Sequence, residues 1–335
     1  MSQHFLLTAK ARSLSIRQIF ALTDQAAFEM FKQSRWGAGH PSCPRCGLLD
    51  SHYFIASRRQ WRCKACGHTF SVTTGTIFAS HKLPLKIYLA AIAIYCNAVK
   101  GLSALQLSRD LDVQYKTAFV LSHKLRESLL AQRDNAALDG AVEVDGAYVN
   151  GHVRPANKKA DRVDRRLAEH QNPDKRCVLV LRSRGAKGQG GKRSLTFVAK
   201  SENQAGTIAL AGRYVKKGAM LFADEAPAYD PLHGMFSTQR VNHQIEYRSD
   251  DGAHTNNAES YFSRFRRMQY GQMHRFGTLY LDNYANEAAY REDNRRMSNG
   301  AMFSDVLAKC GATRASRDFC GYWQGNKRLA ERLVN

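Results

Sequence analysis

The sequence has few acidic residues and no hydrophobic run long enough to cross a bilayer. Asp and Glu together number 29 against 50 Lys and Arg, which gives this 335-residue chain a formal net charge of +21 at pH 7. The longest apolar run, residues 85–96, is too short for a membrane-spanning helix, which needs roughly 20 residues. The N-terminus combines basic residues with neither an apolar core nor a small-residue cleavage site, so we expect no signal peptide. Positive charge without a membrane segment favours a polyanionic partner.

Cysteines arranged as a disulfide scaffold are also lacking. Four of the eight cysteines form two close pairs, and the other four are scattered along the chain. This pattern is typical of a metal site in a reducing cytosol, because disulfide scaffolds need an oxidising compartment. The sequence shows no clear internal repeat, and its length allows two or three domains. We therefore expect a cytoplasmic, multidomain protein.

Two Cys-x-x-Cys turns lie near the N-terminus. Cys43 and Cys46 form the first turn, Cys63 and Cys66 form the second, and sixteen residues separate them. Two such turns at this distance bring four thiolates into the tetrahedron of a structural Zn²⁺ site, whereas a redox dithiol needs only one pair. Short hairpin strands are predicted between the turns, so the segment indicates a zinc ribbon with one Zn²⁺. Its basic residues favour contacts with nucleic acid.

Helical periodicity extends over residues 82–135. Residues 85–99 are apolar nearly all round and predict a buried helix, and Ser103 caps a short helix after it. A turn over 111–113 and a helix over 114–130 complete the pattern of a helix-turn-helix. An earlier, separate helix is predicted near the N-terminus, after Thr23 as its N-cap.

The start of the last helix in this pattern is the candidate recognition surface. Gln114, Tyr115 and Lys116 lie there and can contact base edges or phosphates. Asp112 occupies the turn position where Gly is commoner, although Asp tolerates a left-handed backbone. A plain helical hairpin is the alternative interpretation.

An acid ends the first strand predicted in the second half of the chain. Val142 and Val144 alternate with Glu143 and Asp145, and Gly146 then breaks the run. This pattern predicts a half-buried strand that ends at Asp145. We expect Glu143 to face away from the site that Asp145 forms.

Two further acids follow at comparable positions. The predicted elements after Asp145 are strands at 176–183 and 194–199, a helix at 204–214 and a strand at 220–224. Asp224 ends that strand, and Glu259 lies on a later helix, with 34 residues between the two. This order is the ribonuclease H-like arrangement, in which the first and fourth strands are neighbours. Three converging carboxylates are suited to Mg²⁺ or Mn²⁺, and two such ions catalyse in-line displacement at phosphorus.

The motifs together resemble a known family, the insertion-sequence DDE transposases with an N-terminal zinc ribbon, the fifteen-ninety-five group. The resemblance covers nearly the whole chain and rests on Cys43-Pro-Arg-Cys46-Gly47, Trp61-Arg-Cys-Lys-Ala-Cys66-Gly67, Gly75-Thr-Ile-Phe78, Glu143-Val-Asp-Gly-Ala-Tyr148, Ala223-Asp-Glu, Tyr229 and His254-Thr-Asn-Asn-Ala-Glu-Ser260. It implies that Asp145, Asp224 and Glu259 bind the catalytic metal and that the four cysteines bind zinc. It also implies a prokaryotic, nucleoid-associated protein.

Residues around the third acid leave alternatives open. Asn256 and Glu259 also fit a capping box, and Asn256 or Asn257 is a possible third ligand. His243 and His254 are candidate active-site residues, with a structural role as the alternative. The helix that carries Glu259 also carries three arginines that either bind DNA or form a solvated face, namely Arg264, Arg266 and Arg267.

These observations predict a multidomain α+β protein. The expected segments are an N-terminal helical element (1–36), a zinc ribbon (37–80), a helix-turn-helix-like region (81–137), a ribonuclease H-like α/β domain with a mixed sheet and a basic insertion at 152–193 (138–300), and a C-terminal helical tail (301–335). The expected function is recognition of transposon ends, metal-dependent 3′-end cleavage and strand transfer into target DNA by a homodimer or larger assembly. A ribonuclease H-like nuclease or resolvase, and an inactive transposase-derived DNA-binding regulator, are the alternatives.

Overall fold

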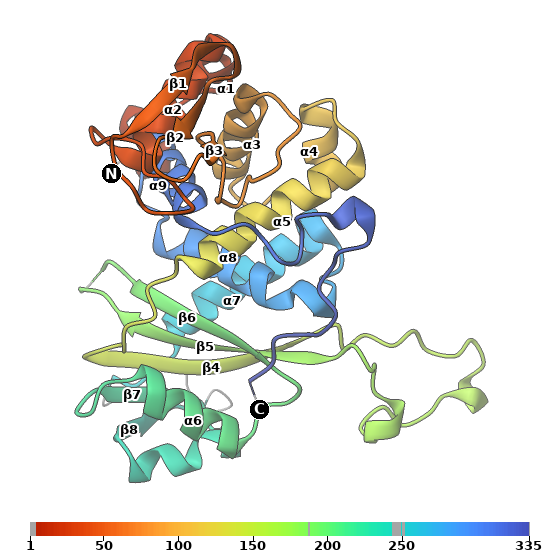
Figure 1. Ribbon diagram of the computed structural model, residues 1–335. Helices are drawn as coiled ribbons and strands as arrows, with labels where there is room; N and C mark the ends of the chain where they lie inside the picture. Colours follow the sequence, from red (N-terminus) through yellow and green to blue (C-terminus); the bar gives the residue numbers. More distant parts are fainter. Residues whose placement is uncertain (1–4, 187, 243–248, 250–251, 335) are drawn as a thin grey trace. The chain divides into compact units, whose positions relative to one another are not determined.

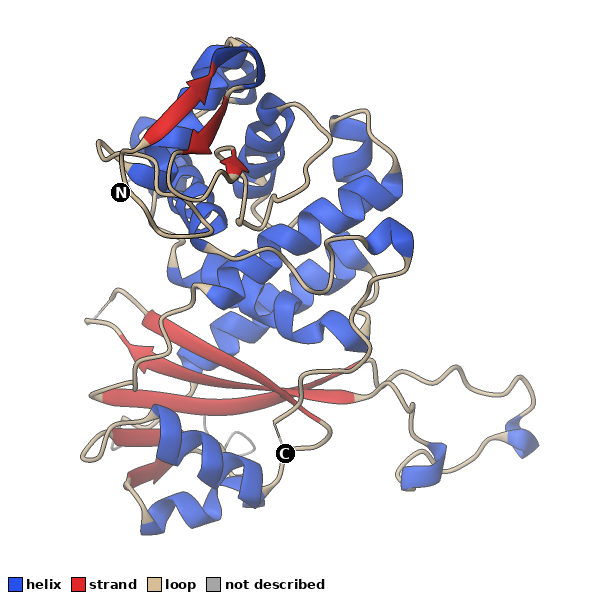
Figure 2. Ribbon diagram, viewed as in Figure 1, coloured by secondary structure: helices blue, strands red, loops and turns tan. Residues whose placement is uncertain are grey.

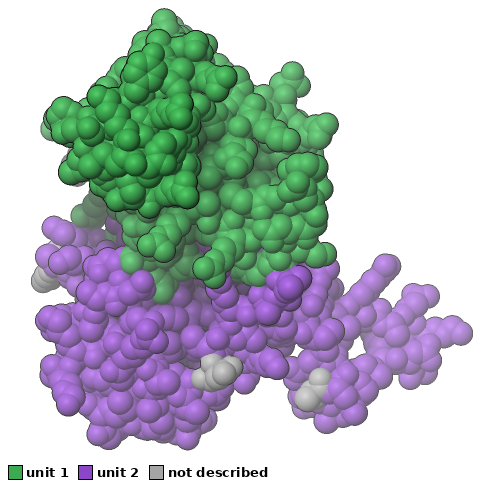
Figure 3. All heavy atoms as spheres, in the orientation of Figure 1, with its two compact units in different colours: residues 1–133, 294–328 green, residues 134–293, 329–335 purple. Residues whose placement is uncertain are grey.

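The computed structural model describes residues 5–186, 188–242, 249 and 252–334, and its chain divides into two compact units (Figure 3). Unit 1 comprises residues 1–133 and 294–328, and unit 2 comprises residues 134–293 and 329–335. Within the described ranges, no helix is both long and apolar enough to cross a membrane. The division into five segments stays a prediction.

A small sheet and one helix form the N-terminal part of unit 1. The antiparallel strands β1 (His52–Ile55), β2 (Gln60–Cys63) and β3 (Thr69–Phe70) lie in that order. Helix α2 (Asp24–Trp36) begins after Thr23, whose hydroxyl accepts a hydrogen bond from Ala26 N at 3.1 Å, which confirms the predicted cap. The ring of Trp61 lies 5.6 Å from that of Phe28 and 5.3 Å from that of Trp36. This aromatic cluster attaches the sheet to α2.

Further helices belong to unit 1 (Figures 1 and 2). They are α1 (Ile16–Phe20), α3 (Leu85–Asn97), α4 (Ala104–Asp110), α5 (Tyr115–Ala131) and α9 (Asn299–Ala312). Helix α9 packs against α2, α3 and α5, and α4 packs against α5. Ser103 caps α4, and Asp112 adopts a left-handed backbone with φ 50° in the turn before α5, as its sequence position suggested. Helix α9 carries no motif that the sequence analysis assigned.

Unit 2 is built on a five-stranded mixed sheet. Its strands are β4 (Ala141–Val149), β5 (Arg176–Arg184), β6 (Gly191–Ala199), β7 (Met220–Ala223) and β8 (Ser237–Arg240), in the spatial order β6-β5-β4-β7-β8. Strands β4, β5 and β6 are antiparallel neighbours, whereas β7 runs parallel to β4 and β8 runs parallel to β7. This is the ribonuclease H-like order that the sequence predicted. The short strand β8 was not predicted.

Helices cover both faces of this sheet (Figures 1 and 2). Helix α6 (Gln204–Tyr214) packs on one face over an apolar core that includes Val142 and Val144. Helices α7 (Asn256–Met268) and α8 (Leu281–Asp293) pack on the other face, against β4, β5 and β6. Buried charges lie beneath them, since Glu143 and Arg182 are both fully buried. The loop between β4 and β5 extends away from the sheet in Figure 1.

Shorter helical segments connect these elements. The 3-10 helices are Phe5–Leu7, Ala9–Ala11, Ala56–Arg58, Lys159–Asp161, Ala168–His170, Pro227–Gly234, Thr278–Tyr280 and Tyr322–Gln324, and a π-helical turn spans Gln269–Met273.

Two expectations about element ends were wrong. Strand β4 does not end at Gly146, because this glycine pairs with Leu179 in the ladder and the strand continues to Val149. The C-terminal tail is helical in α9, but residues 327–333 are not helical. That segment instead binds strands of unit 2: Glu331 Oε2 accepts a hydrogen bond from Arg176 Nε at 2.7 Å, and Val334 N donates to the carbonyl of Val198 at 2.8 Å.

Candidate catalytic and zinc sites

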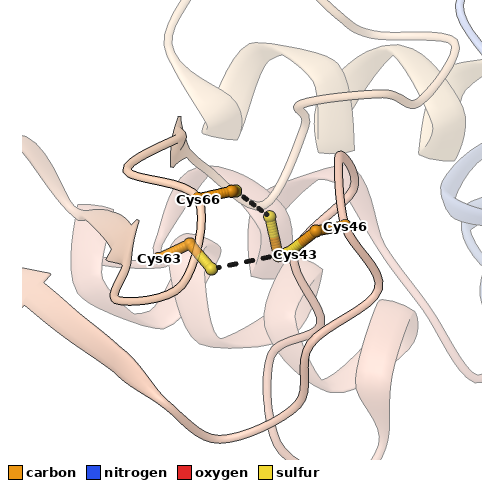
Figure 4. Close-up of side chains that lie close together, drawn as sticks. All are labelled: Cys43, Cys46, Cys63 and Cys66. Atoms are coloured by element: carbon orange, nitrogen blue, oxygen red, sulfur yellow. Dashed lines mark hydrogen bonds between the residues drawn. The ribbon is translucent and has the colours of Figure 1, made fainter.

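The four paired cysteines converge in the ribbon, and their side chains point toward one another (Figure 4). The Sγ atoms of Cys43 and Cys66 lie 3.6 Å apart, as do those of Cys46 and Cys63. All four sulfurs lie within 4.8 Å of one another. Tetrahedral Zn²⁺ with Zn–S bonds of about 2.3 Å places its sulfurs roughly 3.8 Å apart. The donor set and spacing therefore fit a structural Zn²⁺ ion.

Two of the three candidate acids stand on neighbouring parallel strands. The register of β4 and β7 pairs Glu143 with Phe222. Asp145 and Asp224 lie two residues beyond this pair, so the register leads both acids to the same edge of the sheet, where the charge of Asp224 acts on Asp145. The Asp224 carboxylate accepts a hydrogen bond from Ala226 N at 3.0 Å, which holds it just beyond the end of β7. Its backbone carbonyl accepts from Arg240 on β8.

The electrostatics of Asp145 indicate that the third acid is also near. The pKa of Asp145 is raised to about 8, first by burial, and then by the negative charges of Asp224, Glu202 and Glu259. A hydrogen bond from Gly146 N partly opposes this rise. Like charges and desolvation both disfavour the ionised carboxylate. Asp145 is thus the residue on which the charges of the site converge.

The acids are neighbours without forming a compact ligand shell. Among the described residues, the four cysteines are the group of three or more candidate ligands whose atoms all lie within 4.8 Å of one another. The carboxylate oxygens of the three candidate acids do not all lie within this distance of one another. Mutual repulsion of carboxylates accounts for such a spread, and a divalent cation between them removes it.

Glu143 binds the helix that carries Glu259. Its Oε2 accepts hydrogen bonds from Asn257 N at 2.8 Å and Ala258 N at 2.9 Å, and its Oε1 accepts from Asn257 Nδ2 at 2.7 Å. Thr255, the residue before α7, provides no side-chain cap. The Glu143 carboxylate therefore takes the place of a capping side chain at the start of α7.

The expectation that Glu143 faces away from Asp145 was wrong. Residues two apart in a strand lie on the same face, and this face of β4 is covered by α7. Sequence reasoning therefore missed Glu143 as a part of the site, although the alternation of residues 142–145 contained the signal.

The candidate histidines have different outcomes. His243 lies outside the described residues. His254 is half-buried beside Glu143, with its Nδ1 3.3 Å from Glu143 Oε1. Arg184 binds both residues, because its Nε donates to Glu143 Oε1 at 2.7 Å and its Nη2 donates to the carbonyl of His254. These contacts hold His254 in place between Glu143 and Arg184.

The two asparagines differ in their availability. The side-chain amide of Asn257 donates to Glu143 and so is engaged in holding α7. Asn256 is exposed at the first residue of α7, and Glu259 is exposed in the same first turn. Asn256 and Glu259 are therefore both exposed in this turn, whereas the amide of Asn257 is engaged.

A fourth carboxylate, Glu202, was missed from the sequence. A Cβ at position 146 would lie only 2.5 Å from its Oε1, so a side chain there would displace the Glu202 carboxylate from this position. The Tyr229 hydroxyl donates a hydrogen bond to the same oxygen. Burial and the charge of Asp224 raise the pKa of Glu202. Glu202 lies in a loop after β6, and no periodicity distinguishes it, but the glycine after Asp145 is a signal of close approach.

The candidate DNA-binding residues occupy different surroundings. Arg264 is half-buried, and its Nε donates to Glu292 Oε2 of α8 at 2.7 Å. Arg266 and Arg267 are exposed on the same helix. Gln114 and Tyr115 are exposed at the start of α5, and Lys116 Nζ lies 5.5 Å from the ring centre of Tyr322.

Two family models match the chain. Residues 137–293 match the ISXO2-like transposase domain, and residues 22–69 match the transposase zinc-ribbon domain. Both confirm the resemblance drawn from the motifs. The ribbon match includes α2, in agreement with the packing of Phe28 and Trp36 on Trp61.

Two individual proteins also match the chain, both at less than 30% sequence identity. The chain is 29% identical over 255 residues to a Halobacterium salinarum protein described as an uncharacterized protein in transposable element ISH50, and the match covers 73% of this chain and 83% of the relative. A solved Mos1 transposase paired-end complex with left transposon end matches at 13% identity and a TM-score of 0.21, over 70% of this chain and 82% of that one. A score this low is no basis for an argument about fold or function.

Proposed function

We propose that this chain, which carries an ISXO2-like transposase domain behind a transposase zinc ribbon, binds the ends of its insertion sequence, cleaves their 3′ strands and joins them to target DNA. The observation that supports the proposal is the parallel register of β4 and β7, which ends two residues before Asp145 and Asp224 and so leads both acids to one edge of the sheet. Glu259 enters from the first turn of α7, and its charge contributes to the raised pKa of Asp145.

The donor chemistry of this cluster fits hard divalent cations. Asp145 and Asp224 would hold Mg²⁺ or Mn²⁺ from the sheet, and Glu259 would hold it from the helix, because carboxylate oxygens are the ligands these ions prefer. Bound ions supply Lewis-acid stabilisation of the attacking and leaving oxygens in an in-line displacement at phosphorus. The residues themselves only bind and orient, so no covalent enzyme intermediate is required.

The third ligand in this proposal is Glu259. Asn257 is engaged by Glu143, so the choice is between Glu259 and Asn256. A charged carboxylate binds a divalent cation more strongly than an amide does. Glu202 lies beside Asp145 but is held by Tyr229, and we assign it no ligand role here.

Recognition of DNA is assigned to unit 1 and to exposed arginines of α7. The zinc ribbon and the start of α5 would bind the transposon ends, with Gln114, Tyr115 and Lys116 as the base or phosphate contacts. Arg266 and Arg267 would contact the phosphate backbone near the acids. A homodimer or larger assembly follows from the need to pair two ends.

Metal-dependent nicking of an end-containing duplex tests the proposal. We expect Asp145→Ala, Asp224→Ala and Glu259→Ala to lower the cleavage rate by roughly a thousandfold or more while DNA binding persists, because each change removes a metal ligand. Asn256→Ala should retain cleavage. Glu225→Ala removes an exposed acid next to Asp224 and serves as the matched control.

The outcomes separate the alternatives. Full cleavage by Glu259→Ala together with inactivity of Asn256→Ala would transfer the third position to the asparagine. Cleavage by wild type without joining to a target duplex would indicate a nuclease or resolvase. Absence of any metal-dependent cleavage on authentic end DNA would leave a DNA-binding regulator.

A further inference from the structure

Unit 1 contains a cavity of about 520 Å³ that the proposed chemistry does not use. Its walls come from the start of α5, from residues 79–83 before α3, and from residues 319–324 near the end of the unit. A volume of this size is typical of small-molecule sites in proteins. The cavity is therefore large enough for a nucleotide.

The lining combines positive charge with aromatic rings. Lys82, Lys116 and Lys124 line the cavity, and the described lining residues include neither Asp nor Glu. Tyr322 and Trp323 supply ring surfaces at its edge. The side chain of Trp323 is 64% exposed, so this large apolar ring is not part of a core. The exposed ring of Trp323 therefore shares one cavity with three ammonium groups and a second aromatic ring.

The lysines lie close to these rings in the free protein. Lys82 Nζ lies 4.7 Å from the ring centre of Trp323, and Lys116 Nζ lies 5.5 Å from that of Tyr322. Such cation–π contacts at exposed sites are weak. An anion that also carries an aromatic ring can therefore replace them, because its phosphate attracts the ammonium groups while its ring stacks on the freed aromatic face.

We propose that this cavity binds an unpaired nucleotide of DNA, with its base stacked on Trp323 or Tyr322 and its phosphate bound by the lysines. Proteins that bind single strands combine aromatic platforms with a basic groove in this way, and stacking tolerates any base. A base inside a duplex cannot place its ring there, because neighbouring base pairs cover both of its faces. The inference relies on DNA as the partner in the proposed function, but not on the metal chemistry of the acids.

Tryptophan fluorescence of the full chain provides the test. Trp36 and Trp61 pack in the aromatic cluster of the ribbon, which leaves Trp323 as the exposed member of the three tryptophans. We expect a short single-stranded oligothymidylate, without added magnesium or manganese, to quench the emission of the wild type. Trp323→Leu should abolish most of this quenching and weaken binding of the oligonucleotide on the order of tenfold, which is the loss expected for one stacked base.

Two matched controls separate the cavity from general charge and surface effects. Phe20→Leu removes a 44% exposed aromatic ring at the end of α1 that does not line the cavity, and should leave oligothymidylate affinity unchanged. Lys82→Ala should weaken binding more than Lys100→Ala, which removes one exposed positive charge outside the cavity. A duplex with an unpaired 3′ overhang should bind the wild type more tightly than a blunt duplex with equal phosphates, and Trp323→Leu should lose that preference.

Several results would overturn the proposal. Equal loss of affinity in Trp323→Leu and Phe20→Leu would remove the cavity from the interaction. Equal quenching by the blunt duplex, by a polyglutamate peptide or by inorganic phosphate at the same concentration would show that an unpaired base is not the ligand. Because binding is measured without cleavage, failure here is distinct from failure of the nicking test.

Discussion

Asp145 is the residue at which charge and burial compete most directly. Its carboxyl group has a pKa raised to about 8, mainly by burial and secondly by Asp224. The unfolded chain releases this proton near the ordinary value of 3.8. Between these two values the folded, metal-free protein binds more protons than the unfolded chain, so stability from this group falls as the pH rises and levels off above about 8.

Asp145→Asn should therefore stabilise the metal-free protein at high pH. We expect the variant to exceed the wild type by about 1–3 kcal/mol above pH 8, with the difference shrinking toward pH 4, because the neutral amide removes the buried charge. Thermal unfolding of both proteins across this pH range measures the difference in stability. Mg²⁺ at pH 8 should raise the melting temperature of the wild type and leave that of the variant nearly unchanged. Parallel pH curves for the two proteins would contradict this account.

At the scale of elements, the hydrogen bonds between β4 and the start of α7 determine the position of Glu259. Helix α7 begins without a side-chain cap of its own, and the fully buried Glu143 carboxylate binds its first N–H groups. Arg184 neutralises that carboxylate from β5, with Nε 2.7 Å from Oε1. The sheet therefore sets the position of the helix start through a charged hydrogen-bond network.

Glu143→Gln tests this positioning role. The amide keeps an oxygen acceptor but loses the charge that Arg184 and the helix N-terminus require, so we expect the nicking rate to fall roughly 10–100-fold. The half-saturating Mg²⁺ concentration should also rise, since Glu259 would be held less firmly. Glu287→Gln is the matched control, because it removes another fully buried acid, paired with Arg291 within α8. If both variants lose stability but share an unchanged Mg²⁺ requirement, Glu143 is only structural.

At the scale of the whole molecule, the net charge of +21 determines how the proposed binding to DNA should depend on salt. Phosphate contacts release counterions, so affinity depends steeply on salt. A chain this basic should bind any duplex at low ionic strength, and such binding alone does not identify transposon ends.

The salt dependence of duplex binding is accordingly a prediction about the charged surface. Affinity for an arbitrary duplex should fall by about a thousandfold or more between roughly 50 and 200 mM salt. Replacing Arg266 and Arg267 together by Ala should reduce the slope of log affinity against log salt by about 2. Arg264→Ala should leave the slope unchanged, because its guanidinium already pairs with Glu292. A slope unaffected by the double change would place the phosphate contacts elsewhere.

The sequence by itself determined those features whose signal is local. Cysteine spacing predicted the zinc cluster, alternation and acids predicted the strand order, and Thr23 and Ser103 marked helix starts. The cysteine turns and helix starts depend on neighbours within a few residues, where propensity and periodicity act, whereas the strand order followed from the succession of elements along the chain. Strand β8 was not predicted, because its residues Ser237–Arg240 show no apolar alternation. They form a strand through their parallel pairing with β7.

Only the tertiary structure decided the contacts that join distant segments. Glu143 reaches the start of α7 more than a hundred residues away, and Glu202 reaches Gly146 from a loop after β6. Residues 327–333 were predicted to be helical but are not, and Glu331 in this segment instead accepts a hydrogen bond from Arg176. Such pairings depend on burial and charge compensation that arise after the strands and helices have packed, so a local pattern does not identify the partner residue.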